Sequence, residues 1–145
     1  MGLGRSASGN MRTAITIAAL LTLLMSYHSL ASDRICKGNP DIVASCFNIH
    51  GRLALHNGTP SVRIWRIGTQ RILSVVHPEN EIMPSRLRHW LSWDRTLYAD
   101  FEVCPFAKER AGWMQDVCIE SASNIVVEEY DKQTKTTKVY RLRND

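Results

Sequence analysis

Residues 46–76 alternate between apolar and polar side chains, and this alternation constrains the fold more than any other feature of the chain. Within 47–55 the odd positions are apolar or glycine, and the even positions are mostly polar. Such period-two alternation is typical of a β-strand with one buried face. Turn signals separate this strand from two more, predicted at 61–67 and 71–76. Gly51, on the apolar face of the first strand, predicts a bulge or a sharp bend.

The second half of the chain continues with a helix and more strands. Leu87, Trp90 and Leu91 recur at helical spacing and predict a short helix over 85–93, with Ser85 as its N-cap.

Apolar and polar residues alternate again over 97–103 and 114–120, which predicts two further strands. A C-terminal hairpin is expected from 124–130 and 137–142, around a turn at 131–134. The predicted order is therefore β-β-β-α-β-β followed by the hairpin.

This order resembles the oligonucleotide/oligosaccharide-binding (OB) fold, in which a helix after the third strand covers one end of a five-stranded barrel. The resemblance implies a mainly β protein built as a small, partly open β-barrel with one short helix. A glycine bend in the first strand fits such a barrel, because that strand must curve to pair with two neighbours. A small β-sandwich, or an antiparallel sheet with one helix, would give nearly the same pattern, so these alternatives stay open.

Residues 1–31 have the pattern of a cleaved signal peptide. Arg5 and Arg12 precede an apolar core at 14–25, and small residues before position 32 predict cleavage after Ala31. Twelve residues are too few to cross a bilayer, which takes about 20. The mature chain is therefore expected to have no membrane span and to be periplasmic or secreted.

The mature chain is expected to comprise an irregular arm at 32–44 and a single β-rich domain at 45–145. Of the chain's 18 basic and 14 acidic residues, the leader carries two basic ones, so the predicted mature net charge is +2. The charge is unevenly distributed, because no carboxylate lies between Asp41 and Glu79 while four arginines do. A basic face on a nearly neutral protein is therefore expected.

An even number of cysteines in an exported domain predicts two disulfides. Three pairings can be drawn from four cysteines. We favour the two that close short loops, Cys36–Cys46 and Cys104–Cys118, the latter as a bridge on the outside of a hairpin. Their spacing does not match a zinc site.

Three segments resemble stretches found together in small secreted proteins of Gram-negative bacteria: GRLALHNGTPSVRIWRIGTQRIL (51–73), DRTLYADFEVCPF (94–106) and QDVCIESASN (115–124). The resemblance implies an exported domain with a periplasmic address. It implies no activity and assigns no site residues.

The acid-free stretch carries the candidate binding face. Arginines bind phosphate, sulfate or carboxylate groups with paired hydrogen bonds, and a tryptophan stacks on rings. We place Val62 and Ile64 in the core and Arg63 and Trp65 outside, although the opposite register stays open. The candidate residues are Arg52, Arg63, Trp65, Arg66, Arg71 and His50, with His56 nearby.

An alternative interpretation makes these arginines ordinary solvated residues that pair with carboxylates of a neighbouring strand. The carboxylates expected to pair with them are Asp100, Glu102, Asp116 and Glu120.

Catalytic and metal-binding interpretations have less support in the sequence. His50 and His56 share a strand face but lie about 20 Å apart along an extended strand, too far to share an ion. Asp100 and Glu102 have a spacing that suits paired carboxylates, but that spacing is common. No GxSxG, HExxH or phosphate-binding glycine loop is present in the sequence. We therefore expect no enzyme activity, no metal and no cofactor.

The sequence thus predicts a non-catalytic, disulfide-stabilised binding module for an anionic small molecule, a glycan or an envelope polymer. Export makes nucleic acid an unexpected partner. The competing hypothesis is a structural protein that joins another envelope protein through a sheet edge or the C-terminal hairpin. The binding-module hypothesis depends on the arginine face, and the structural-protein hypothesis depends on an exposed sheet edge or the C-terminal hairpin.

Overall fold

A computed structural model of the chain describes residues 35–76 and 83–143, so the predicted signal peptide at 1–31 lies outside the described residues. The protein is mainly β, with one short helix among the described residues. Its elements are β1 (Phe47–Leu55), β2 (Val62–Arg66), β3 (Ile72–Val75), α2 (Ser85–Trp90), β4 (Arg95–Pro105), β5 (Gln115–Asp131) and β6 (Thr136–Arg141).

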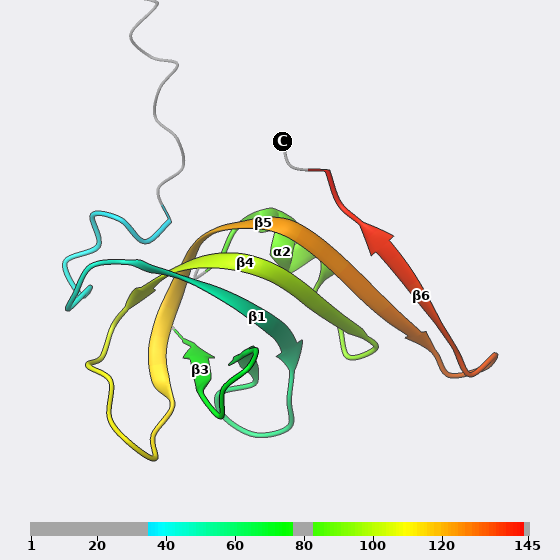
Figure 1. Cartoon of the computed structure of the whole chain (residues 1–145), viewed down its shortest axis with the longest axis horizontal. Coiled ribbons are helices and arrows are strands. Elements are labelled where there is room, and N and C mark those ends of the chain that lie inside the picture. The colour runs from blue at the N-terminus through cyan, green and yellow to red at the C-terminus, as the bar shows by residue number, and fades with distance from the viewer. Residues whose placement is uncertain (1–34, 77–82, 144–145) are drawn as a thin grey trace, which may run out of the picture. The chain divides into compact units, whose positions relative to one another are not determined.

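The strands form one sheet in the order β3-β2-β1-β4-β5-β6. Neighbouring strands are antiparallel, and β3 also pairs in parallel with the start of β5. This extra pairing brings the first five strands into a partly closed ring, and the β5–β6 hairpin extends away from it (Figure 1). The mainly β class of the prediction is confirmed.

The alternation in β1 separates the core from the outer face as predicted. Leu53 is fully buried in the core, and Ile64 of β2 lies opposite it. The core also takes in Leu87 of α2, together with inward-facing side chains of β3, β4 and β5. Because Ile64 points inward, the predicted register of β2 is confirmed and Trp65 lies on the outer face.

Three local predictions are corrected. The strand predicted at 114–120 and the first arm of the C-terminal hairpin are one continuous strand, β5. The helix spans Ser85–Trp90 rather than 85–93, and Pro84 rather than Ser85 occupies its N-cap position, without a side-chain capping hydrogen bond. Gly51 is not at a bulge, because β1 keeps its register with β2 and β4 through that position. The register shifts lie between β4 and β5 instead.

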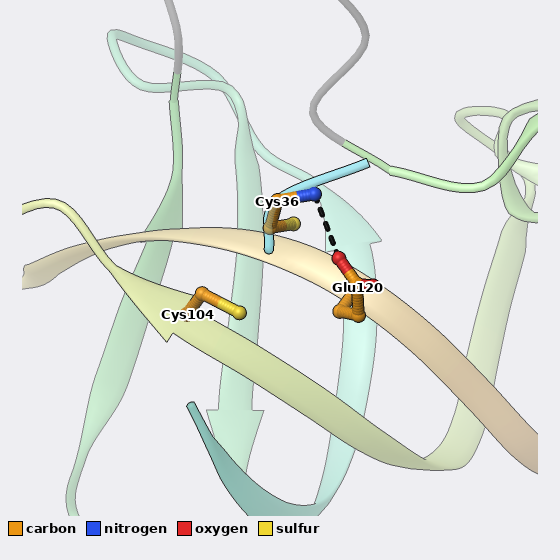
Figure 2. Close-up of side chains that lie close together, drawn as sticks. All are labelled: Cys36, Cys104 and Glu120. Atoms are coloured by element: carbon orange, nitrogen blue, oxygen red, sulfur yellow. Dashed lines mark hydrogen bonds between the residues drawn. The ribbon is translucent and has the colours of Figure 1, made fainter. Parts of the chain in front are cut away.

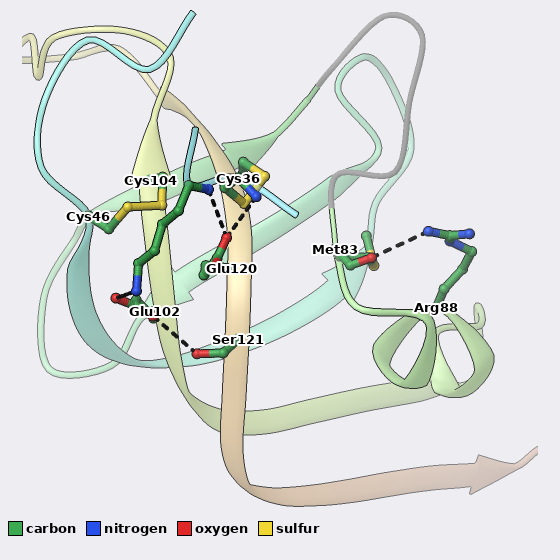
Figure 3. The surroundings of a disulfide bond; sticks show 10 residues. Cys36, Cys46, Met83, Arg88, Glu102, Cys104, Glu120 and Ser121 are labelled. Carbon is green, nitrogen blue, oxygen red and sulfur yellow. Dashed lines mark hydrogen bonds and ion pairs between the residues drawn. A yellow bond between two sulfur atoms is a disulfide. The ribbon is translucent and has the colours of Figure 1, made fainter. Parts of the chain in front are cut away.

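The predicted disulfide pairing is wrong. The bonds join Cys36 to Cys118 and Cys46 to Cys104, and Figure 3 shows their surroundings. Cys104 and Cys118 do face each other across β4 and β5. Each is nevertheless bonded to a cysteine that lies far away in sequence, by 82 residues for one bond and 58 for the other. The assumption that each disulfide closes a short loop therefore led to the wrong pairing.

The N-terminal arm explains this pairing. It lies against β4 and β5, so Cys104 and Cys118 are buried rather than on an open outer face. Glu120 accepts hydrogen bonds from the backbone nitrogens of Cys36 and Lys37, at 2.7 and 3.0 Å. Lys37 Nζ also lies 2.7 Å from Glu102 Oε1.

The two disulfides are compatible with an oxidising, exported environment. Within the described ranges, no helix has both the length and the apolar character needed to cross a bilayer.

Candidate functional site

Half of the predicted site residues come together on the outer face of β1 and β2. Arg52 lies directly opposite Trp65, and Ala54 lies opposite Arg63. Trp65 in turn faces Ile72 of β3. Because alternate residues of a strand share one face, the side chains of Arg52, Arg63 and Trp65 form one cluster.

This cluster lines an open hollow of about 270 Å³, which we call the arginine hollow. Its lining residues are Arg52, His56, Arg63, Trp65 and Ile72. Trp65 and Ile72 are large apolar side chains, yet they remain 37% and 39% exposed. The hollow therefore offers apolar surface beside two guanidinium groups.

The two guanidinium groups of the arginine hollow are not neutralised by a described carboxylate. Arg52 lies over the indole of Trp65, with Cζ 5.1 Å from the ring centre. Arg63 Nε donates to the carbonyl oxygen of Pro60 at 2.9 Å, and its Nη2 lies 3.5 Å from that of Asn57. Among the described residues neither arginine has an ion-pair partner, and no carboxylate lines the hollow. A positive potential in the hollow follows.

His56 responds to this potential. Burial lowers the pKa of His56, and the charges of Arg63 and Arg52 lower it further. The imidazole is therefore neutral at neutral pH, and the two arginines carry the charge of the hollow.

The indole of Trp65 is held in place by a turn. Its Nε1 donates to the carbonyl oxygen of Thr69 at 2.7 Å, and Thr69 Oγ1 donates to the carbonyl oxygen of Arg66 at 2.8 Å. These bonds fix the ring within the β2–β3 connection. Fixed aromatic rings lose little entropy when a ligand stacks on them.

The other predicted residues lie elsewhere. His50 Nδ1 is 2.8 Å from Asp100 Oδ1, and Arg71 Nη2 is 3.0 Å from Glu109 Oε1. Arg66 is exposed at the end of β2 and does not line the arginine hollow.

Three of the four carboxylates expected to pair with the arginines, Asp100, Glu102 and Glu120, have other partners. Hydrogen bonds from Asn124 and His50 lower the pKa of Asp100. Glu102 and Glu120 bind the N-terminal arm. Cross-strand charge pairing is therefore seen for His50, but not for Arg52 or Arg63.

A second hollow, of about 580 Å³, adjoins the first and was missed by sequence reasoning. Trp113 and Met114 of the β4–β5 loop line it, and Ile72 lines both hollows. We call it the loop hollow. The signal in the sequence was an adjacent Trp-Met pair in a glycine-containing loop, but only the parallel β3–β5 pairing brings this loop beside β3.

A third hollow, of about 360 Å³, lies at the β5–β6 hairpin and carries mixed charges. Trp93 and Tyr130 line it together with the carboxylates of Asp94 and Asp131. Hydrogen bonds lower the pKa of both carboxyl groups, so both are ionised at neutral pH. This hollow is less suited to an anion than the arginine hollow.

One cluster has the composition of a metal site. Figure 2 shows Cys36, Cys104 and Glu120, whose ligand atoms lie within 4.8 Å of one another. Both sulfur atoms belong to disulfides, and zinc binding requires thiolates. Glu120 is already engaged by the backbone of the arm. The donor set therefore does not fit a metal ion.

No protein-family model matches the chain, and searches of curated proteins and of solved structures return no match. The functional argument therefore depends on the residues of the site.

Proposed function

We propose that this protein is an exported, disulfide-stabilised binding module that holds an anionic ligand in the arginine hollow and does not transform it. The observation that carries the proposal is the pair of guanidinium groups, Arg52 and Arg63, in a hollow without a facing carboxylate. Arginine hydrogen bonds to anions are charge-assisted and about twice as strong as neutral ones. The exposed indole of Trp65 adds a stacking surface for a ring of the ligand.

We further propose that the first five strands form an OB-like barrel. The ring of pairings β1-β2-β3-β5-β4-β1 supports this assignment, as does the position of α2 between β3 and β4. The arginine hollow then lies over β1, β2 and the start of β3, and so overlaps the strand 2–3 face that such barrels use for ligands.

The periplasm is the proposed address. Two disulfides, the signal-peptide pattern at 1–31 and the resemblance to secreted proteins of Gram-negative bacteria support it. An acidic glycan or envelope polymer is the kind of ligand that such an address offers.

Calorimetric titration with heparin and with polygalacturonate tests the proposal. We expect binding at about 20 mM salt that weakens strongly at about 300 mM, because salt screens exposed charges. Arg52→Gln with Arg63→Gln should weaken binding about tenfold or more, since a hydrogen bond to a charged group contributes about 1.5–3 kcal/mol.

Arg141→Gln is the matched control, because Arg141 is an exposed arginine of β6 outside the hollow. Each single variant, Arg52→Gln or Arg63→Gln, removes one charge, as the control does. Equal losses in the control and in these single variants would show that only net charge matters, and would overturn the proposed site.

A second candidate function is adhesion to another envelope protein through the edge of β6. Among the described strands β6 pairs only with β5, so its outer edge is free, and Val139 is 57% exposed. Exposed edges can pair with a strand of another chain. Val139→Pro should abolish such an association in pull-downs from periplasmic extract, whereas the Arg52 and Arg63 variants should leave it unchanged.

A further inference from the structure

The arginine hollow and the loop hollow meet at Ile72, which lines both of them. Ile72 lies opposite Trp65 of β2, and it shares the lining of the loop hollow with Trp113 and Met114. Trp113 is 64% exposed and Met114 is also exposed. An apolar surface with aromatic rings therefore extends from β2 across β3 to the β4–β5 loop.

The two hollows repeat the same chemical arrangement. Arg110 lies over the indole of Trp113 with Cζ 4.9 Å from the ring centre, as Arg52 lies over Trp65 at 5.1 Å. Among the described residues the Arg110 side chain has no carboxylate partner, and Glu109 is paired with Arg71. Each hollow thus has one exposed indole in its lining, and a guanidinium group without a described ion-pair partner stacks on that indole. The arginine hollow contains Arg63 as well, and Glu109, paired with Arg71, lines the loop hollow.

The loop that carries the second arrangement is tied to the sheet. Arg71 contacts it twice, through Glu109 Oε1 at 3.0 Å and through the carbonyl oxygen of Arg110, 3.4 Å from Nη1. The backbone nitrogen of Trp113 donates to that same carbonyl oxygen at 3.2 Å. These contacts fix the second indole relative to the β2–β3 turn, which holds the first.

We propose that the two hollows are two subsites of one binding site for a linear acidic oligosaccharide, with Arg110, Trp113 and Met114 as additional ligand-binding residues. This proposal rests on the proposed function and specifies its ligand. A sugar ring presents an apolar face that stacks on an indole, and a uronic acid places a carboxylate at the ring edge, where a guanidinium can bind it. An oligomer of uronic acids repeats the sugar ring and the carboxylate along its length, so it can place one ring and one carboxylate in each hollow.

A single-stranded nucleic acid also alternates rings with charges, and arginines and aromatic residues bind it. The disulfides favour the glycan, because they indicate a protein that works outside the cytosol.

The test is a titration of the full mature protein with galacturonic acid oligomers of increasing length, from the dimer to the octamer. Affinity should rise with length and then level off once an oligomer fills both subsites. Trp113→Ala should weaken the longest oligomer about tenfold, the lower end of what stacking on an aromatic ring contributes. It should leave the dimer unaffected, because the dimer fills the arginine hollow alone.

Trp93→Ala is the matched control, since Trp93 is 65% exposed and lines the hollow at the β5–β6 hairpin instead. Both tryptophans are exposed, so both variants should melt at the wild-type temperature, which separates a binding effect from a folding effect.

The outcomes separate this inference from the proposed function. A site limited to the arginine hollow would give equal affinities for all lengths and no effect of Trp113→Ala, while Arg52→Gln still weakens binding. That result overturns the second subsite alone. Absence of binding at every length overturns the proposed function as well. Tighter binding of a thymidine oligonucleotide than of an oligogalacturonate with the same number of charges overturns the glycan assignment.

Discussion

His56 reports the electrostatic potential of the arginine hollow. Its pKa lies below the ordinary value of 6.5, first because of burial and then because of the charges of Arg63 and Arg52. Folding therefore favours the neutral imidazole. As the pH falls below 6.5, the unfolded chain binds a proton before the folded chain does, so the stability contributed by neutral His56 is lost as the pH falls through the folded-state pKa.

We predict that Arg63→Gln raises the pKa of His56 toward its ordinary value, because it removes the larger of the two repulsive charges. The pH dependence of the His56 imidazole signals in NMR spectra measures this change. Arg141→Gln should leave the titration unchanged, since Arg141 does not line the hollow. An unchanged titration in Arg63→Gln would show that the charge of Arg63 does not depress this pKa.

A bound polyanion should act on His56 in the opposite direction to the arginines. Negative charge in the hollow favours the imidazolium form and raises its pKa. By linkage, polygalacturonate affinity should increase as the pH falls from 7 toward about 5, and His56→Gln should remove this increase. Affinity that is independent of pH in this range would place the polymer away from the arginine hollow.

At the scale of single elements, local patterns predicted the strands whose two faces differ in polarity. In β1, alternation placed Leu53 inward and Arg52 outward, as the structure has them. The same reasoning split β5 in two and left residues 121–123 between the two predicted strands. Those residues continue the strand by pairing with β4 between two register shifts. Residues of this kind adopt strand conformation because they pair with a neighbouring strand. The local sequence pattern does not reveal that pairing.

Gly51 of β1 leaves no room for a side chain between the neighbouring core residues. A Cβ at this position would lie 2.6 Å from Ile64 Cγ2 and 3.3 Å from Phe101 Cδ2, and both of those side chains are fully buried. Gly51→Ala should therefore lower the free energy of unfolding by about 1–3 kcal/mol, the usual cost of overpacking a core. Urea denaturation followed by tryptophan fluorescence measures the loss.

A double-mutant cycle identifies the cause of that loss. The closest contact is with Cγ2 of Ile64, a methyl group on its Cβ that leucine lacks. Ile64→Leu should therefore relieve the closest contact of Gly51→Ala. The double variant should then be more stable than the sum of the two single changes implies. Strictly additive effects would show that the contacts of the new Cβ with Phe101 and the Trp65 carbonyl oxygen, rather than with Ile64, cause the loss.

At the scale of the whole molecule, the features that sequence reasoning missed depend on contacts between distant segments. The parallel pairing of β3 with β5 brings Trp113 beside Ile72, and nothing near Trp113 in the sequence indicates this. Likewise the arm carries Cys36 to Cys118. Arg52 and Trp65 could be assigned to one face because they lie on adjacent strands of a meander. The arginine half of the site was therefore predictable, whereas the loop half was not.

One disulfide ties the arm to β5, and the other ties the residue before β1 to β4. Removing them should lower the free energy of unfolding without changing the candidate binding site. They join residues 82 and 58 positions apart, so each is expected to contribute about 4 kcal/mol by restricting the unfolded chain. Cys46→Ser with Cys104→Ser should lower the urea midpoint markedly. Binding of polygalacturonate under native conditions should persist, because no cysteine lines either hollow.

Proteolysis of the unreduced protein and mass spectrometry test the pairing directly. We expect peptides that link Cys36 to Cys118 and Cys46 to Cys104, and each should separate on reduction. A Cys104–Cys118 peptide would contradict this pairing and would leave the arm without its covalent tie to β5. The arm would then be held to β4 and β5 by noncovalent contacts, among them those of Glu120, Lys37 and Val43, and its backbone amides should exchange hydrogen much faster than those of β4.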